Sequence, residues 1–176
     1  MNSDKTGFPV NRTEKMQEVA GCGPQPSVPC DSLPDVTTGL PGLDKVFHGI
    51  QPGDNIVWAV DRIEDYQRLV VPYTAAAKAS GRRVVYFRFG LHEPLFTESS
   101  GLEIHEVDSA NGFERFVRGV HRVIEDCGPG TVYIFDSISS LGDIWQSDQA
   151  LGNFFVLTCP RLYALQTVTD FAIDRD

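Results

Sequence analysis

The chain has 176 residues, of which 41% are hydrophobic and 22% are charged, and its formal net charge is −9. A chain of this size and composition is typical of one globular domain with a buried core. The negative charge excludes nucleic acid and anionic membrane surfaces from the expected partners, because binding to either requires a positive potential.

The N-terminus lacks the apolar segment of a signal peptide, and no run of about 18 apolar residues predicts a membrane span. The chain has four cysteines, at positions 22, 30, 127 and 159, without Cys-x-x-Cys spacing and without a histidine at metal-ligand spacing. Zinc is therefore not expected. We predict a cytoplasmic, thiol-reduced protein.

Residues 1–35 carry five prolines among polar residues. Such a composition cannot bury enough apolar area to offset the entropy of ordering, so we predict a disordered tail at 1–35 and one domain at 36–176. The favoured interpretation of Cys22 and Cys30 is two exposed thiols, and the alternative is a redox or metal pair.

Four short, mainly apolar runs predict buried strands, at Ile56–Val60, Val84–Phe89, Val132–Phe135 and Val168–Ile173. Strands without alternation, separated by helices, indicate a parallel sheet that is covered on both faces. The predicted fold class is a doubly wound α/β sandwich with a mainly parallel sheet.

Three stretches between these strands are predicted to be helical. Residues 64–79 form one helix that Pro72 should kink. Residues 113–124 carry apolar side chains at i, i+3, i+4 and i+7, and Gly128 follows where that helix should stop. Residues 143–166 are expected to form one or two helices broken at Pro160.

The segment from Thr37 to Asp54 reads TTGLPGLDKVFHGIQPGD. It resembles the approach to the first strand in RecA and KaiC-like ATPases. The resemblance implies a strand, here residues 55–59, and then a glycine-rich loop that ends in Gly-Lys-Thr or Gly-Lys-Ser at the start of a helix.

The loop positions G-x-x-x-x-G-K-[ST] fall on residues 60–67, and every defining residue is absent. Val60 and Asp65 stand where glycines would let the backbone close around phosphate. Tyr66 replaces the lysine, and Gln67 replaces the hydroxyl that would hold Mg²⁺. We therefore predict a degenerate loop that does not hold ATP.

Three carboxylates, those of Asp61, Glu64 and Asp65, accompany this change. A helix N-terminus attracts anions, so these acids would occupy the positive end of the helix and repel a phosphate. Asp61 and Glu64 also fit the spacing of a capping box, in which case they only start the helix.

In KaiC-like enzymes an acidic residue that activates water follows the second strand, but Gly90 follows it here. The nearest carboxylate is Glu93, next to His92, in the loop at 90–101. These two residues are interpreted as solvated surface, with a substitute catalytic role as the alternative.

Residues 132–136 keep the apolar run and the aspartate of a Walker B strand. Asp136 would there accept Mg²⁺-bound water, whereas the alternative is that it caps residues 137–141. In this class the next strand, 168–173, lies between the Walker A and Walker B strands. The chain stops three residues later, so we expect either a fragment or a sheet edge covered by another segment or chain.

A narrower resemblance, to the N-terminal region of bacterial phosphoenolpyruvate synthase-like proteins, is carried by residues 51–58, 63–66, 83–89, 151–155 and 157–160. It implies a multidomain relative of pyruvate phosphate dikinase. The ATP-grasp domain, phosphohistidine domain and pyruvate-binding barrel of that family have no counterpart in this sequence.

The leading hypothesis is a non-hydrolysing regulatory or docking module of such a system, with a protein partner or a second copy, no catalytic residue, no metal and no cofactor. The alternative enzyme-class hypothesis is a nucleotide or phosphometabolite site, with ATP and Mg²⁺ as possible ligands, at Asp136, Arg62, Arg88 and His92. Asp136 would then be the metal-linked residue. The third hypothesis is structural self-assembly.

Overall fold

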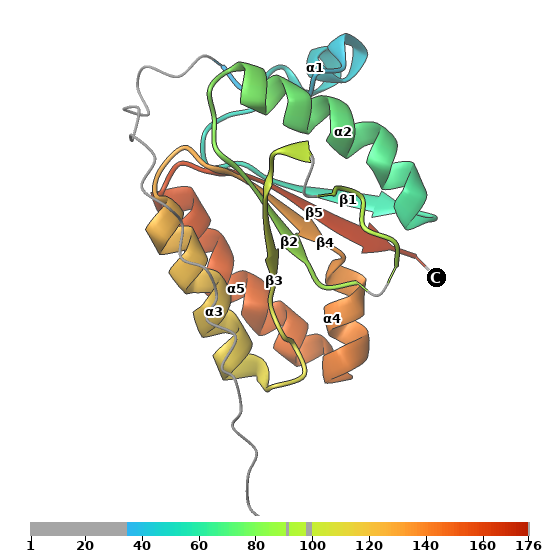
Figure 1. Cartoon of the computed structure of the whole chain (residues 1–176), viewed down its shortest axis with the longest axis vertical. Coiled ribbons are helices and arrows are strands. Elements are labelled where there is room, and N and C mark those ends of the chain that lie inside the picture. The colour runs from blue at the N-terminus through green and yellow to red at the C-terminus, as the bar shows by residue number, and fades with distance from the viewer. Residues whose placement is uncertain (1–34, 91, 98–99, 176) are drawn as a thin grey trace, which may run out of the picture.

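The computed structural model describes residues 35–90, 92–97 and 100–175, so the predicted tail lies almost wholly outside the described residues. Within them a parallel sheet has the order β1-β5-β4-β2-β3 (Figure 1). The strands are β1 (Asn55–Val60), β2 (Val84–Arg88), β3 (Glu103–Glu106), β4 (Val132–Asp136) and β5 (Val168–Asp174). The predicted α/β class with a parallel sheet is confirmed.

The four predicted strands are present, and the short strand β3 was not predicted. Strand β5 lies between β1 and β4, as expected for the strand that follows residues 132–136. All five residues of β4 are buried, whereas β1 at the edge alternates between exposed and partly buried residues up to Val60. Central strands are mainly apolar because both of their faces are covered.

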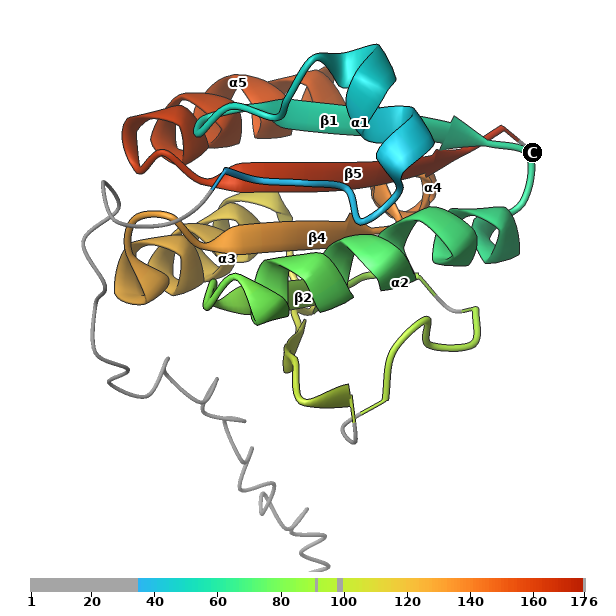
Figure 2. The ribbon, with the colours of Figure 1, turned by 90° about the horizontal axis from the view of Figure 1, so that it is seen from above.

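Helices cover both faces of the sheet (Figure 2). Helices α1 (Pro41–Phe47) and α2 (Ile63–Ala79) lie on one face, and α3 (Phe113–Cys127) and α5 (Asp148–Ala164) lie on the other. Helix α4 (Ile138–Trp145) follows β4 and contacts β5 and α5. Each face has its own apolar core, one built on α2 and one on α3, α4 and α5.

The predicted helix α3 buries its apolar stripe, and Gly128 ends it with a positive φ of 75°. The predicted break at Pro160 is wrong, because α5 runs through this residue and the break lies before Ser147, which caps α5. Pro160 removes the hydrogen bond to the carbonyl of Val156. The side chain of Val156 is exposed, so this part of α5 lies on the solvent side of the helix.

Helix α1 was not predicted, and none of its residues is buried. Asp44 holds its start, because its carboxylate accepts hydrogen bonds from the Thr37 hydroxyl and from the N–H and hydroxyl of Thr38. Slight burial raises the pKa of Asp44, but these hydrogen bonds outweigh it and lower the pKa. The Thr37–Asp44 part of the motif therefore has a structural role here.

None of the helices in the described part of the chain has the length and apolar character needed to cross a membrane.

Candidate functional site

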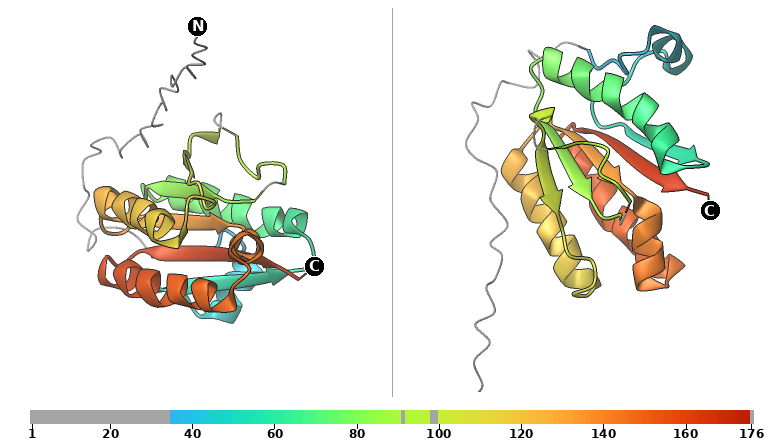
Figure 3. Two further views of the ribbon diagram at one scale, coloured as in Figure 1. Left: turned by 90° about the horizontal axis from the view of Figure 1, so that it is seen from below. Right: turned by 45° about the vertical axis from the view of Figure 1, so that its right-hand side comes forward.

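Parallel α/β sheets bind ligands beyond the carboxyl ends of their strands. In this chain that edge carries the β1–α2 connection, the end of β2 with the loop that follows it, and Asp136 at the end of β4 (Figure 3). The predicted site residues come from these segments.

The connection between β1 and α2 consists of only Asp61 and Arg62, because the helix already begins at Ile63. Positions 63–67 of the expected phosphate loop are therefore helical. Tyr66 is fully buried between α2 and the sheet, where it belongs to the apolar core. The loop thus differs from a phosphate cradle in backbone course as well as in residue type, since a cradle needs several free N–H groups that converge on the anion.

The predicted capping box is wrong. The N-cap residue of α2 is Arg62, and no side chain caps this helix by a hydrogen bond. Asp61 lies outside the helix and is paired at 3.8 Å with Arg175, while Arg62 is paired at 3.6 Å with Asp65. Glu64 and Asp65 remain in the first turn, where their charges favour the positive end of the helix without capping it.

Asp136 is fully buried and has a partner for each carboxylate oxygen. The Tyr86 hydroxyl donates a hydrogen bond to Oδ2, and Nε2 of His92 lies 3.0 Å from Oδ1. Burial raises the pKa of Asp136, while Tyr86, His92 and Arg88 act in the opposite direction. Burial and the nearby carboxylate raise the pKa of Tyr86, so its phenol keeps the proton that it donates.

His92 is held from both sides of its ring. Nδ1 lies 2.8 Å from the carbonyl oxygen of Glu93, which can only accept a hydrogen bond, so Nδ1 carries a proton. The second contact places one proton between Nε2 and Asp136, whichever of the two groups holds it. The imidazole therefore lies against the carboxylate of Asp136.

Arg88 fixes this arrangement. Its guanidinium donates to the carbonyl of His92 at 2.7 Å and pairs with Glu106 of β3 at 2.9 Å. Arg88 and Asp136 also lie side by side in the register of β2 and β4. The start of the 90–101 loop is thereby tied to two strands.

The structure brings together three of the four predicted ligand-binding residues, namely Asp136, Arg88 and His92. Arg62 is 70% exposed, lies at the far side of β5, and pairs with Asp65 instead. The interpretation of His92 as solvated surface is wrong, because its side chain is only 19% exposed, whereas Glu93 is exposed as expected. Asp136 does not cap α4 either, since the N-cap residue is Ser137.

Sequence reasoning missed Tyr86 and Glu106. A tyrosine within a fully buried strand was the available signal, because a buried phenol usually finds an acceptor, and Asp136 ends a neighbouring strand. Among the described residues, no group of three or more His, Cys, Asp or Glu side chains is arranged to hold a metal ion.

No protein-family model matches this sequence, and a search of curated proteins finds no match either.

Proposed function

We propose that this chain is a non-hydrolysing RecA/KaiC-like module that docks a protein partner. The observation that carries the proposal is the closure of both halves of a nucleotide site. The β1–α2 connection has two residues, and Asp136 is occupied by side chains of the same chain. The resemblance to phosphoenolpyruvate synthase-like proteins suggests that the partner belongs to such a system.

The electrostatics of the edge support this proposal. A triphosphate is stabilised by converging N–H groups, by a lysine and by Mg²⁺. At the same place this chain has Glu64 and Asp65 in the first turn of α2 and a tyrosine buried in the core. Like charge at the phosphate position and a filled metal position both weaken nucleotide binding.

The surface that we assign to docking is the free edge of β1 together with the neighbouring face of α5. Strand β1 (NIVWAV) has no ionisable side chain. Val57 is 52% exposed on the α5 side of the sheet, next to Phe171 in register. On α5, Val156 and Tyr163 are exposed, and the Tyr163 ring approaches Gly53 so closely that a Cβ there would lie 2.9 Å away.

An uncharged edge strand beside an apolar helix face is suited to a partner strand that extends the sheet. The opposite edge is different, because Glu103 and Glu106 of β3 carry charges paired with Arg83 and Arg88. Charged residues on an edge oppose pairing with another strand. The asymmetry favours β1 as the docking edge.

Self-assembly is the second candidate, favoured by the same uncharged strand. Antiparallel pairing of two copies centred on Val57 would place Asp54 opposite Val60 and Asp61 opposite Gly53. No two carboxylates would then face each other, so the pairing escapes the repulsion expected elsewhere on a chain with net charge −9.

Nucleotide binding is the direct test of the proposal. We expect no shift in melting temperature with millimolar MgATP and no ATP turnover, because the groups that would bind the phosphates are absent. Mg²⁺-dependent turnover that Asp136→Ala abolishes would contradict the proposal. Grafting a lysine at Tyr66 is not a useful test, since this position is fully buried.

Sedimentation of the wild type and two valine variants separates the docking candidates. Val57→Lys places a charge on the β1 edge, and Val71→Lys, at a 42% exposed site on α2, is the matched control. A concentration-dependent mass that only Val57→Lys abolishes supports self-assembly. A monomer at all concentrations rejects self-assembly, and a candidate partner whose binding is unaffected by Val57→Lys rejects the β1 edge as the docking surface.

A further inference from the structure

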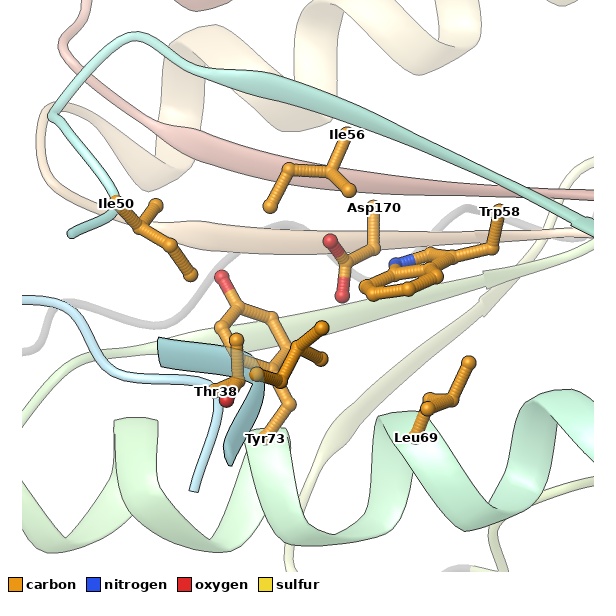
Figure 4. A pocket seen from close by; sticks show the side chains of 8 residues that line it. Thr38, Ile50, Ile56, Trp58, Leu69, Tyr73 and Asp170 are labelled. Atoms are coloured by element: carbon orange, nitrogen blue, oxygen red, sulfur yellow. The ribbon is translucent and has the colours of Figure 1, made fainter. Parts of the chain in front are cut away.

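A second buried carboxylate lies away from the sheet edge described above. Asp170, in the middle of β5, is 2% exposed and faces α2 (Figure 4). It lines a closely packed space whose walls are otherwise apolar, aromatic or hydroxylic. The lining residues are Thr38, Leu43, Ile50, Ile56, Trp58, Leu69, Tyr73 and Asp170.

Three polar atoms of this space lack hydrogen-bond partners in the structure. They are Oδ1 of Asp170, the indole nitrogen of Trp58 and the hydroxyl of Tyr73. Figure 4 shows the carboxylate and the indole nitrogen directed toward each other, with Tyr73 below them. A buried polar group without a partner costs about 1–3 kcal/mol, so a cluster of three calls for a ligand or another explanation.

We propose that this pocket binds a primary ammonium ion that carries a short apolar chain. The ammonium group would donate to Oδ1 of Asp170 and to the Tyr73 hydroxyl, which are the unpartnered acceptors. The faces of Trp58 and Tyr73 would add cation–π attraction in a site shielded from water. The apolar chain would contact Ile56 and Leu69.

Access to the pocket requires movement of the segment that carries α1. In this structure the walls approach so closely that no water-sized sphere fits between them. Helix α1 is well suited to move, because none of its residues is buried. Its links to the body include the Phe47 ring against Trp58, with centroids 5.8 Å apart, and the close approach of Gly39 to Pro72.

This site lies on the α2 face of the sheet and shares strand β1, through Ile56 and Trp58, with the proposed docking surface, but its test variants are not on that strand. Asp170 lies inside the sheet, in register with Ile134 of β4, and its side chain is directed to the α2 face. The residues that close the nucleotide site are at the strand ends, so variants of the pocket leave them in place.

The test is a titration of the full chain with n-butylammonium chloride, followed by calorimetry and by NMR of the Trp58 indole N–H. n-Butanol is the neutral control of equal chain length, and sodium chloride is the control for ionic strength. We expect saturable binding of n-butylammonium that is at least about tenfold tighter than that of n-butanol. Equal binding of the two compounds, or binding of neither, would overturn the proposal.

Two variants test the residues. Asp170→Asn keeps the shape of the side chain and should weaken n-butylammonium binding at least about tenfold, while Asp61→Asn, at an exposed carboxylate, should leave it unchanged. If Asp170→Asn fails to fold, Tyr73→Phe serves instead, because its hydroxyl has no partner to lose. Unchanged affinity in the folded variant would overturn the assignment.

Discussion

Asp136 and Asp170 are both buried aspartates on neighbouring strands, yet their surroundings differ. Asp136, on β4, has Tyr86 on one carboxylate oxygen and His92 on the other. Asp170, on β5, has one oxygen without a partner. Burial raises the pKa of both groups, but at Asp136 three neighbours oppose the increase, whereas burial raises the pKa of Asp170 to about 7 with only Trp58 opposing it.

The comparison shows that burial alone does not determine what a carboxylate can do. Each oxygen of Asp136 already has a hydrogen-bond partner within the chain. Asp170 is desolvated with only Trp58 to offset the cost, which makes it costly to the fold and available to a cation. The position that resembles a Walker B aspartate is therefore the less available of the two.

The largest expected effect is the pH dependence that Asp170 imposes on stability. Its pKa is about 7 in the folded state against an ordinary value of 3.8, so between these values the folded state binds the additional proton. Stability then falls as pH rises through this window, by about 4 kcal/mol in total and about 3 kcal/mol between pH 5 and pH 8. The neighbouring hydroxyls of Tyr66 and Tyr73 stay neutral there, because burial raises the pKa of each.

Urea unfolding of the wild type and Asp170→Asn at pH 5 and pH 8 measures this contribution. The amide does not titrate, so the variant should lack the decrease and should be the more stable protein at pH 8. Identical pH dependence of the two proteins would show that Asp170 has a compensating partner.

Removing a partner of Asp136 should lower the free energy of unfolding, whereas Asp170→Asn should raise it at pH 8. His92→Ala leaves Oδ1 of a buried carboxylate without its hydrogen bond, and we expect a loss of about 2 kcal/mol in the free energy of unfolding. Glu93→Ala, at the exposed neighbouring position, should change stability by less than about 0.5 kcal/mol. Chemical denaturation at pH 7 measures both, and equal effects would mean that His92 does not stabilise Asp136.

Two Tyr→Phe variants allow the same comparison, because each removes a single hydroxyl group. Tyr86→Phe deletes the hydroxyl that donates to Asp136 and should cost about 1–2 kcal/mol. Tyr73→Phe deletes a hydroxyl without a partner and should be neutral or slightly stabilising. If Tyr73→Phe were as destabilising as Tyr86→Phe in urea unfolding, the Asp170 pocket would contain a hydrogen bond that the structure lacks.

The sequence predicted most of the sheet because apolar runs identify buried strands directly. It also predicted that β5 would lie between β1 and β4, which rests on the resemblance to RecA and KaiC-like proteins. Strand β3 was missed because Glu103, His105 and Glu106 give it no apolar pattern. Ion pairs with Arg83 and Arg88 stabilise it instead, and such pairs depend on tertiary structure.

At the site, residue types alone predicted a loop without phosphate-binding residues but not the course of the backbone. The early start of α2 follows from the burial of Tyr66, which anchors the first turns in the core. The contact between His92 and Asp136 joins residues 44 positions apart in the chain. Local patterns carry no information about such pairs, so the loop was interpreted as solvated surface.

The smallest expected effect concerns carboxylates in a third environment, at the exposed start of α2. The side chain of Asp61 is 83% exposed, and neither Asp61 nor Glu64 caps the helix by a hydrogen bond. What remains is the attraction between Glu64 and the helix dipole, which is worth about 0.3–1 kcal/mol near a helix start, and the exposed Asp61–Arg175 ion pair, which adds little. The double variant Asp61→Ala with Glu64→Gln should therefore lose less than about 1 kcal/mol in urea unfolding, and less still at high salt, because salt screens exposed charges. A salt-independent loss of about 2 kcal/mol would indicate a capping hydrogen bond in solution, since such a bond is short-ranged and insensitive to screening. A small, salt-sensitive loss would show that these acids differ from the buried Asp136: they need no hydrogen-bond partner in the protein, because water already solvates them.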